Sequence, residues 1–193
     1  MRNQLQWAAA FAIGVASIVP AGATTLVHMS LEKLVATNEM VVLGEALEAH
    51  SYWGPGASLI LTDVRFAVSE VLKGERPEKE LTITLPGGRV GDRTHVLVGT
   101  AVLEPGNSYV LFLDRVKLPG ATPVLAIRDH VQGAFDVKLA KDGLRAVSQA
   151  AEHPLVPDAI GSMEPPGGKE GVRLETLIRS IREIERSGRQ EVK

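Results

Sequence analysis

The feature that most constrains the fold is a ten-residue alternation that runs from residue 60 to residue 69. One set of alternating positions is mostly apolar and the other carries the charged side chains: the first set is Ile60, Thr62, Val64, Phe66 and Val68, and the second is Leu61, Asp63, Arg65, Ala67 and Ser69. Because successive side chains of a strand point to opposite faces, this pattern predicts a half-buried β-strand of unusual length. Strands of this length often bend and serve two parts of a sheet, as they do in small barrels.

Further segments also have the composition of strands. The run from Met40 to Gly44 is rich in β-branched residues and can continue to His50, and Gly44 indicates a bulge or a tight bend. A Gly/Pro turn follows at residues 53–56. The remaining predicted strands cover residues 81–85, 95–98, 109–113, 124–127, 135–139 and 144–147. The last two are separated by Lys141-Asp142-Gly143, which is typical of a β-hairpin turn.

Two segments have helical signals instead. Residues 30–38 predict a short helix, with Ser30 as its N-cap and Asn38 as a left-handed stop. Residues 172–188 predict an amphipathic helix that ends at Gly188 and must bury one apolar stripe. The stripe consists of Leu174, Leu177, Ile178, Ile181 and Ile184. Its cover can be the β domain, a second copy of the chain or a partner protein.

Together these elements predict an all-β fold: a small OB-type Greek-key barrel, or a sandwich, with a short N-terminal helix and a C-terminal amphipathic helix. We assign the β-barrel domain to residues 24–147. Residues 148–171 contain four prolines and four glycines without any periodicity, so they predict a linker to the terminal helix at 172–188.

Residues 1–23 have the features of a cleavable signal peptide. Arg2 supplies a positive charge, residues 7–19 form an uncharged apolar run, and Ala21 and Ala23 fit the small positions before a cleavage site. We expect cleavage after Ala23 and export to the periplasm or out of the cell. A membrane anchor is the alternative, but the apolar run is shorter than the roughly 20 residues that span a bilayer. No other segment is long and apolar enough for a membrane span.

Charge and cysteine content narrow the classes of ligand. Of the 21 basic residues only Arg2 lies in residues 1–23, which leaves 20 basic against 23 acidic residues in the mature chain. Nucleic-acid binders usually carry a basic excess, so we expect no nucleic-acid partner. The chain has no cysteine, which excludes disulfides, thiolate metal sites and a lipoprotein anchor.

Several framework segments resemble a group of exported bacterial proteins. These segments are SLEKLVATNEMVVLGEA at 30–46, VSEVLKG at 68–74, TITLPGG at 82–88, EPGNSYVLFL at 104–113 and VQGAFDV at 131–137. The group looks like distant relatives of netrin-like modules, the OB-fold class that includes the tissue inhibitors of metalloproteinases. The resemblance spans roughly residues 30–147 and lies in turns, bulges and core strands, so it implies a fold more than an activity.

One departure from that family concerns its inhibitory mechanism. The resemblance implies that such inhibitors chelate the target's zinc with an N-terminal cysteine, whereas the expected mature terminus here is Thr24-Thr25. No residue of this chain matches the chelating cysteine, and we therefore expect no general zinc-directed inhibition.

The sequence contains no strong catalytic or metal-binding motif. Its five histidines are scattered, and Glu48 with His50, two apart on a predicted strand, would need a third ligand such as His95 or Asp63. No serine lies in a G-x-S-x-G setting. We therefore predict no catalytic residues, no metal site and no cofactor.

Two segments are candidates for a binding surface. One is the turn that carries Tyr52 and Trp53, since aromatic residues are scarce in this chain and are enriched where proteins bind one another. The other is the loop at residues 86–93, where Arg89 and Arg93 could help to hold an anion, although it lacks the order of a phosphate-binding loop. A lid packed over one barrel end is the alternative for Trp53, and an ordinary connecting loop is the alternative for residues 86–93.

These observations favour an exported, non-catalytic binding module, inhibitor-like in fold, whose ligand the sequence does not identify and can be a protein partner. Two alternatives stay open. One is a structural or assembly protein that docks a partner through its C-terminal helix, and the other is a hydrolase with an unrecognised site. A binding module is expected to expose an apolar or aromatic patch, whereas a hydrolase needs a polar pocket with perturbed groups.

Overall fold

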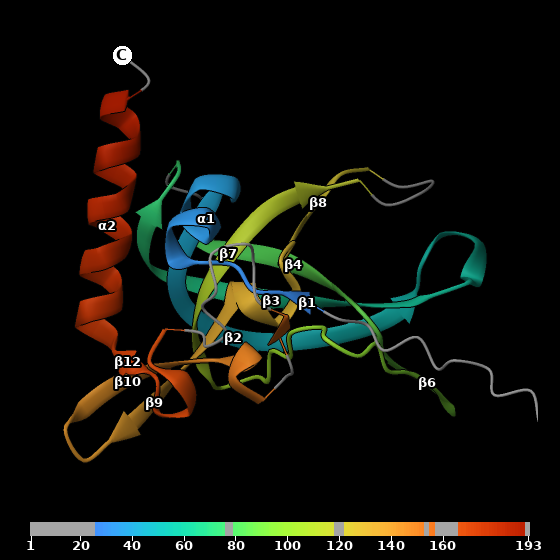
Figure 1. The fold of residues 1–193 in the computed structure, drawn as a ribbon. Coiled ribbons are helices and arrows are strands. Elements are labelled where there is room, and N and C mark those ends of the chain that lie inside the picture. The colour runs from blue at the N-terminus through green and yellow to red at the C-terminus, as the bar shows by residue number, and fades with distance from the viewer. Residues whose placement is uncertain (1–25, 76–78, 118–121, 153–154, 157–165, 192–193) are drawn as a thin grey trace, which may run out of the picture.

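A computed structural model of the chain describes residues 26–75, 79–117, 122–152, 155–156 and 166–191 (Figure 1). The predicted signal peptide, and much of the predicted linker, lie outside the described residues. The helices are α1 (Leu31–Thr37) and α2 (Leu174–Glu191). The strands are β1 (Leu26–Val27), β2 (Met40–Trp53), β3 (Ile60–Lys73), β4 (Glu80–Pro86), β5 (Gly88–Val90), β6 (Arg93–His95), β7 (Ser108–Val116), β8 (Val124–Ala126), β9 (Ala134–Ala140), β10 (Gly143–Ser148), β11 (Leu155–Val156) and β12 (Val172–Arg173).

The main sheet has eight strands in the order β12-β10-β9-β7-β2-β3-β4, with β8 paired to β7 beside this path. Within the described residues, all ladders of this sheet are antiparallel, and some join segments far apart in the sequence, such as β2 with β7. The sheet curls, and β8 contacts β4, but no ladder joins them in the described part of the chain. The protein is therefore mostly β-sheet with one N-terminal and one C-terminal helix, and its sheet is not closed into a barrel.

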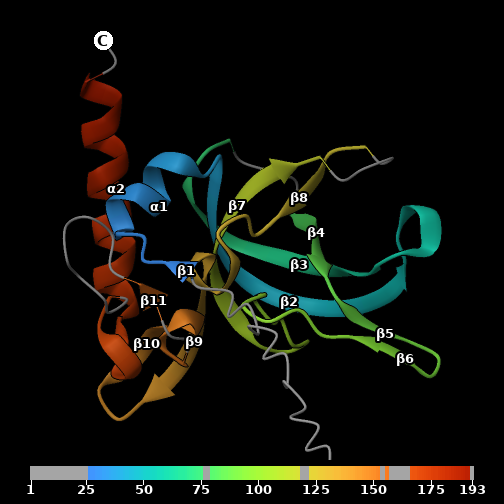
Figure 2. The same ribbon diagram turned by 45° about the vertical axis from the view of Figure 1, so that its right-hand side comes forward.

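The long strands β2 and β3 form the curved centre of the sheet (Figures 1 and 2). Three register shifts interrupt their pairing, one of them between Leu43 and Gly44, where the sequence predicts a bulge or bend. A Cβ atom added to Gly44 would lie only 2.1 Å from the carbonyl oxygen of Ala67. Glycine therefore lets the two strands approach closely where β2 bends.

Hydrophobic residues form a core on each side of the sheet. One core lies inside the curl and includes Val64, Phe66, Ile83 and Leu111. The other lies between the sheet and the two helices and includes Phe112 and Phe135, whose ring centroids are 5.8 Å apart. Helix α2 buries Leu174, Leu177 and Ile181 in this second core. The apolar stripe of α2 therefore packs against the protein's own sheet and helix α1.

The ends of the helices differ from the sequence-based expectation. Ser30 caps α1 as predicted, since its hydroxyl oxygen accepts a hydrogen bond from the backbone N–H of Lys33. The prediction of a left-handed stop at Asn38 is wrong, because the backbone there is extended, with φ of −92° and ψ of 140°. The Asn38 amide instead donates to the carbonyl oxygen of Leu34 and to the carboxylate of Asp129, at 3.0 and 2.6 Å. Helix α2 runs from Leu174 to Glu191 and so continues past Gly188.

Residues around the predicted linker also have defined neighbours where the structure describes them. Strand β11 pairs with β1 in parallel, and β12 pairs with β10 directly before α2 begins. In the described part of the chain, no helix is long and apolar enough to cross a membrane.

Candidate binding surface

Five large apolar side chains are exposed at the end of β2 and on the segment that follows β6. They are Trp53, Val96, Leu97, Val98 and Val102, and we call them the apolar patch. Figures 1 and 2 show the β5–β6 hairpin near the end of the molecule where β2 and β3 are joined. Val96 and Val98 are 82% and 75% exposed, and Trp53 is 39% exposed. Exposed apolar groups are common one at a time, whereas a cluster on a small protein usually marks an interaction surface.

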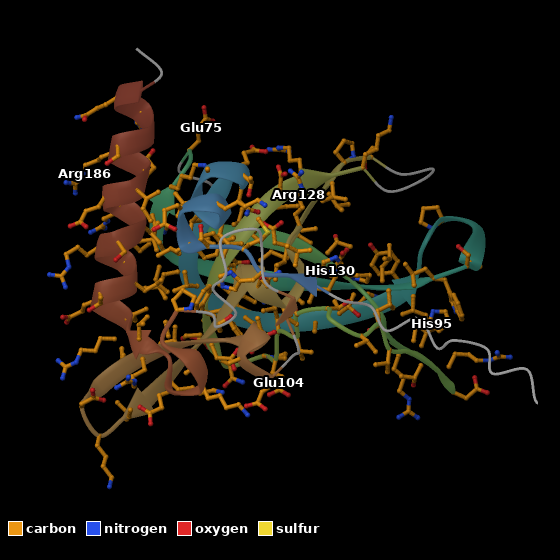
Figure 3. The ribbon with its side chains drawn as sticks, viewed as in Figure 1. Glu75, His95, Glu104, Arg128, His130 and Arg186 are labelled. Atoms are coloured by element: carbon orange, nitrogen blue, oxygen red, sulfur yellow. The ribbon has the colours of Figure 1, made fainter. Side chains whose placement is uncertain are left out.

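His95 connects the elements that carry the apolar patch. It ends β6, and its ring and the Trp53 ring form a T-shaped contact with centroids 5.4 Å apart. Its Nδ1 atom accepts a hydrogen bond of 3.1 Å from the backbone N–H of Ile60, the first residue of β3. Figure 3 shows His95 at this end, beside the β5–β6 hairpin. One imidazole thus attaches the hairpin to the β2–β3 connection and positions the Trp53 ring.

The segment after β6 is anchored although it displays exposed side chains. Ala101 and Leu103 point into the core, so Val102 between them points outward. The Gln149 side chain holds the backbone of Val102 with two hydrogen bonds, accepting from its N–H at 2.9 Å and donating to its carbonyl oxygen at 2.7 Å. The N–H of Val131 also donates to the carbonyl oxygen of Gly99 at 3.0 Å. The backbone at residues 99–103, directly after Val96, Leu97 and Val98, is therefore held in place before any partner arrives. Order of this kind in the free protein reduces the entropic cost of binding.

A cleft of about 360 Å³ opens beside the apolar patch. Its walls are mainly apolar, and Arg89 contributes the one charged side chain among the lining residues. The floor is close-packed, since a Cβ atom at Gly88 would lie 2.2 Å from Oγ1 of Thr62 and 2.5 Å from Oγ of Ser51. Thr62 in turn donates a hydrogen bond of 2.8 Å to the carbonyl oxygen of Gly87. These contacts fix the strand that leads into the β5–β6 hairpin.

The four candidate residues from the sequence do not form one cluster. Trp53 belongs to the apolar patch, and Arg89 lines the adjacent cleft. The β5–β6 register pairs Arg89 with Thr94 and Val90 with Arg93, so the two arginines lie on opposite faces of the hairpin. Tyr52 precedes Trp53 in β2 and therefore lies on the opposite sheet face.

Tyr52 has a hydrogen-bonded role on its face of the sheet. Its hydroxyl donates to the Asp63 carboxylate at 3.2 Å, and Thr84 donates to the same oxygen at 2.7 Å. Burial, together with the negative charge of Asp63, raises the pKa of the Tyr52 phenol. The phenol therefore stays protonated at neutral pH and can keep donating to Asp63.

The polar residues considered for metal binding or catalysis make other contacts. Glu48 forms an ion pair of 2.9 Å with Arg65, and the His50 ring stacks on Tyr52 with centroids 6.4 Å apart. Within the described ranges, no group of three or more histidine and acidic residues could hold a metal ion.

The structure has two further cavities, and Val102 of the apolar patch also lines the first of them. A cleft of about 510 Å³ between β7, β9 and β10 is lined by mixed charges, several of which are paired, such as Asp136 with Lys138 at 3.0 Å. A groove of about 640 Å³ lies between α1 and the end of α2. Lys73, on its wall, donates hydrogen bonds to the carbonyl oxygens of Val35 and Asn38 at the end of α1, and burial lowers the pKa of its ammonium group. Lys73 thus has a structural role as a helix cap.

The sequence reasoning missed Val96, Val98 and Val102 as candidate surface residues. The available signal is the apolar run at 95–98, which predicts a strand. In the structure the strand ends at His95, and the following residues are exposed.

Comparison with known proteins finds no matching family model and no matching curated protein. The geometry of the apolar patch therefore carries the functional inference.

Proposed function

We propose that this chain is an exported, non-catalytic binding module that engages a protein partner through the apolar patch. One observation carries the proposal: Val96 and Val98 are largely exposed on a segment that backbone hydrogen bonds and the buried Ala101 and Leu103 hold in place. Exposing such side chains brings no gain in folding, since apolar groups stabilise a protein only when they leave water. A partner that covers them gains that contribution on binding.

The alternative of docking through the C-terminal helix has less support. The stripe of α2 is already buried in the second core, so a partner would first have to displace the helix from the sheet. The apolar patch is accessible without any such change. A hydrolase is also less supported, because Asp136, an acidic residue in the charged cleft between β7, β9 and β10, forms an ion pair with Lys138.

We also propose that the domain is a variant of the OB-type, netrin-like architecture. Three features support this assignment: β2, β3, β4 and β7 curl around one core, β8 contacts β4 across the gap, and α1 packs beside α2 on one face of the sheet. The signal peptide that the sequence predicts at residues 1–23 supports the proposal of a function outside the cytoplasm.

The test is affinity capture with the native envelope fraction and growth medium, using the full chain and two variants. The Val96→Asp/Val98→Asp variant places charges in the apolar patch. Leu139→Asp is the matched control, because Leu139 is equally exposed, at 83%, on the distant β9–β10 hairpin. We expect a protein that is retained by the wild type and by Leu139→Asp and lost with the double variant. Equal capture by all three proteins would show that the apolar patch is not the binding surface.

A further inference from the structure

Strand β6 is the outer strand of the β5–β6 hairpin. Within the described residues its only ladder partner is β5, so its other edge is open. Both ribbon views show β6 at the outside of the molecule (Figures 1 and 2). An open edge presents unpaired N–H and C=O groups, and proteins often bind extended segments there by adding a strand.

The direction of the backbone groups can be deduced from His95. Its carbonyl oxygen would lie 2.9 Å from a Cβ atom at Gly87, so this carbonyl faces the strand that leads into β5. Backbone polar groups of successive residues in an extended strand point to opposite edges. Thr94, the middle residue of β6, therefore presents its N–H and C=O groups to the open edge. Thr94 and the following Val96 both line the apolar cleft, so an added strand would lie beside it.

The hairpin also carries positive charge in an acidic protein. Arg89 and Arg93 are exposed, one on each face of the hairpin, and neither forms an ion pair with any residue that the structure describes. Asp92 is the one acidic residue between them, whereas the whole chain has a formal net charge of −2. Arg89 uses one donor on the carbonyl oxygen of Gly91, which leaves the rest of its guanidinium N–H groups available. Carboxylates are the groups that best match these donors.

From these observations we infer that the partner contributes an extended segment that adds to the open edge of β6. The segment places alternate apolar side chains against the cleft and the apolar patch, and it carries Asp or Glu beside them to meet Arg89 and Arg93. This inference rests on the proposed function and specifies the chemistry of the partner: an acidic, apolar, strand-forming peptide.

The probe is a displayed library of random octapeptides, selected on the full chain, on Arg89→Glu/Arg93→Glu and on the control Arg186→Glu. Arg186 is exposed on α2, at the opposite end of the molecule (Figure 3). We expect the wild type and the control to enrich peptides that combine Asp or Glu with alternating Val, Ile or aromatic residues. Affinity, measured by fluorescence polarisation, should fall at least about tenfold in the double variant, because charge-assisted hydrogen bonds are lost and like charges meet. The double variant should select basic peptides instead.

A second measurement uses only the wild-type chain. The best peptide is synthesised with a single N-methyl group at each position in turn. Because alternate amides face the neighbouring strand, we expect binding to be lost at every second position in the part that pairs with β6.

Three results would overturn the inference. They are enrichment of peptides without acidic residues, binding that tolerates every N-methyl group, and no enrichment of any peptide. Each leaves the protein-capture test unaffected, so the apolar patch can still be a binding surface of another kind. Concentration-dependent dimers that disappear with Val96→Asp/Val98→Asp would also overturn it, because the open edge would then be occupied by a second copy.

Discussion

Phe66 and Arg65 are neighbours in β3 with opposite surroundings. The Phe66 ring is completely buried in the core inside the curl, whereas the Arg65 side chain is 49% exposed and pairs with Glu48. We expect Phe66→Ala to lower the free energy of unfolding by about 3–5 kcal/mol, since it leaves a cavity in a packed core. Arg65→Ala should change it by no more than about 0.5 kcal/mol. Urea melts measure both, and equal losses would contradict the alternation of β3.

At the residue scale, local patterns predict the burial of a side chain well where that burial follows from its neighbours in the sequence. The alternation predicted that Val64 and Phe66 are buried and Arg65 exposed, and the structure confirms this. Asn38 was predicted wrongly, because its amide bonds to Asp129, which lies 91 residues away in the sequence. The sequence predicts that Tyr52 and Trp53 lie in one turn, but β2 extends to Trp53 and so places the two side chains on opposite faces of the sheet.

At the scale of elements, α2 has a defined place against the sheet. Leu177 and Ile181 are buried between α2 and the sheet, and Arg182 forms an ion pair with Glu70 of β3. We expect Leu177→Ala and Ile181→Ala each to destabilise the whole protein by about 2–5 kcal/mol. The control Arg179→Ala, on the exposed face, should stay within about 0.5 kcal/mol. If the leucine and isoleucine variants unfold like the wild type in urea, the helix does not contribute to the core.

The amphipathic pattern predicts that α2 exists and which face it buries. It does not predict whether that face packs on the β domain, on a second copy of the chain or on a partner protein. The choice among them depends on β3, β10 and α1, which are distant in the sequence. The same applies to residues 96–98, whose apolar run fits either a buried strand or an exposed segment. Contacts with Val131 and Gln149 hold the following residues in place, and no local pattern indicates them.

On the scale of the whole molecule, the mostly β fold with two terminal helices was predictable, because strands and helices leave periodic patterns. Whether the sheet closes into a barrel was not predictable from the sequence, because closure depends on which strands, distant in the sequence, lie at the two ends of the sheet. Here β4 and β12 are the two ends of the sheet, and the hairpin β5–β6 forms a separate ladder. The open edge of that hairpin, on which the proposed partner binds, is a consequence of this arrangement.

Export is a property of the whole chain, and it has a direct test. The charge at Arg2, the apolar run at 7–19 and the small residues Ala21 and Ala23 predict cleavage after Ala23. Mass spectrometry of the exported protein should therefore find a chain that begins at Thr24. An intact chain that begins at Met1 in the membrane fraction would contradict the assignment.

The central claim is that a protein partner covers the apolar patch, and Trp53 is placed to report it. The chain has two tryptophans, Trp7 and Trp53, so a Trp7→Phe variant grown with 5-fluorotryptophan carries a single fluorine label at position 53. Its fluorine NMR resonance in the free protein should shift between H2O and D2O, because Trp53 is 39% exposed. The account predicts that saturation with the captured partner moves this resonance and abolishes its solvent shift. An unchanged resonance with an unchanged solvent shift at saturation would show that the partner binds elsewhere.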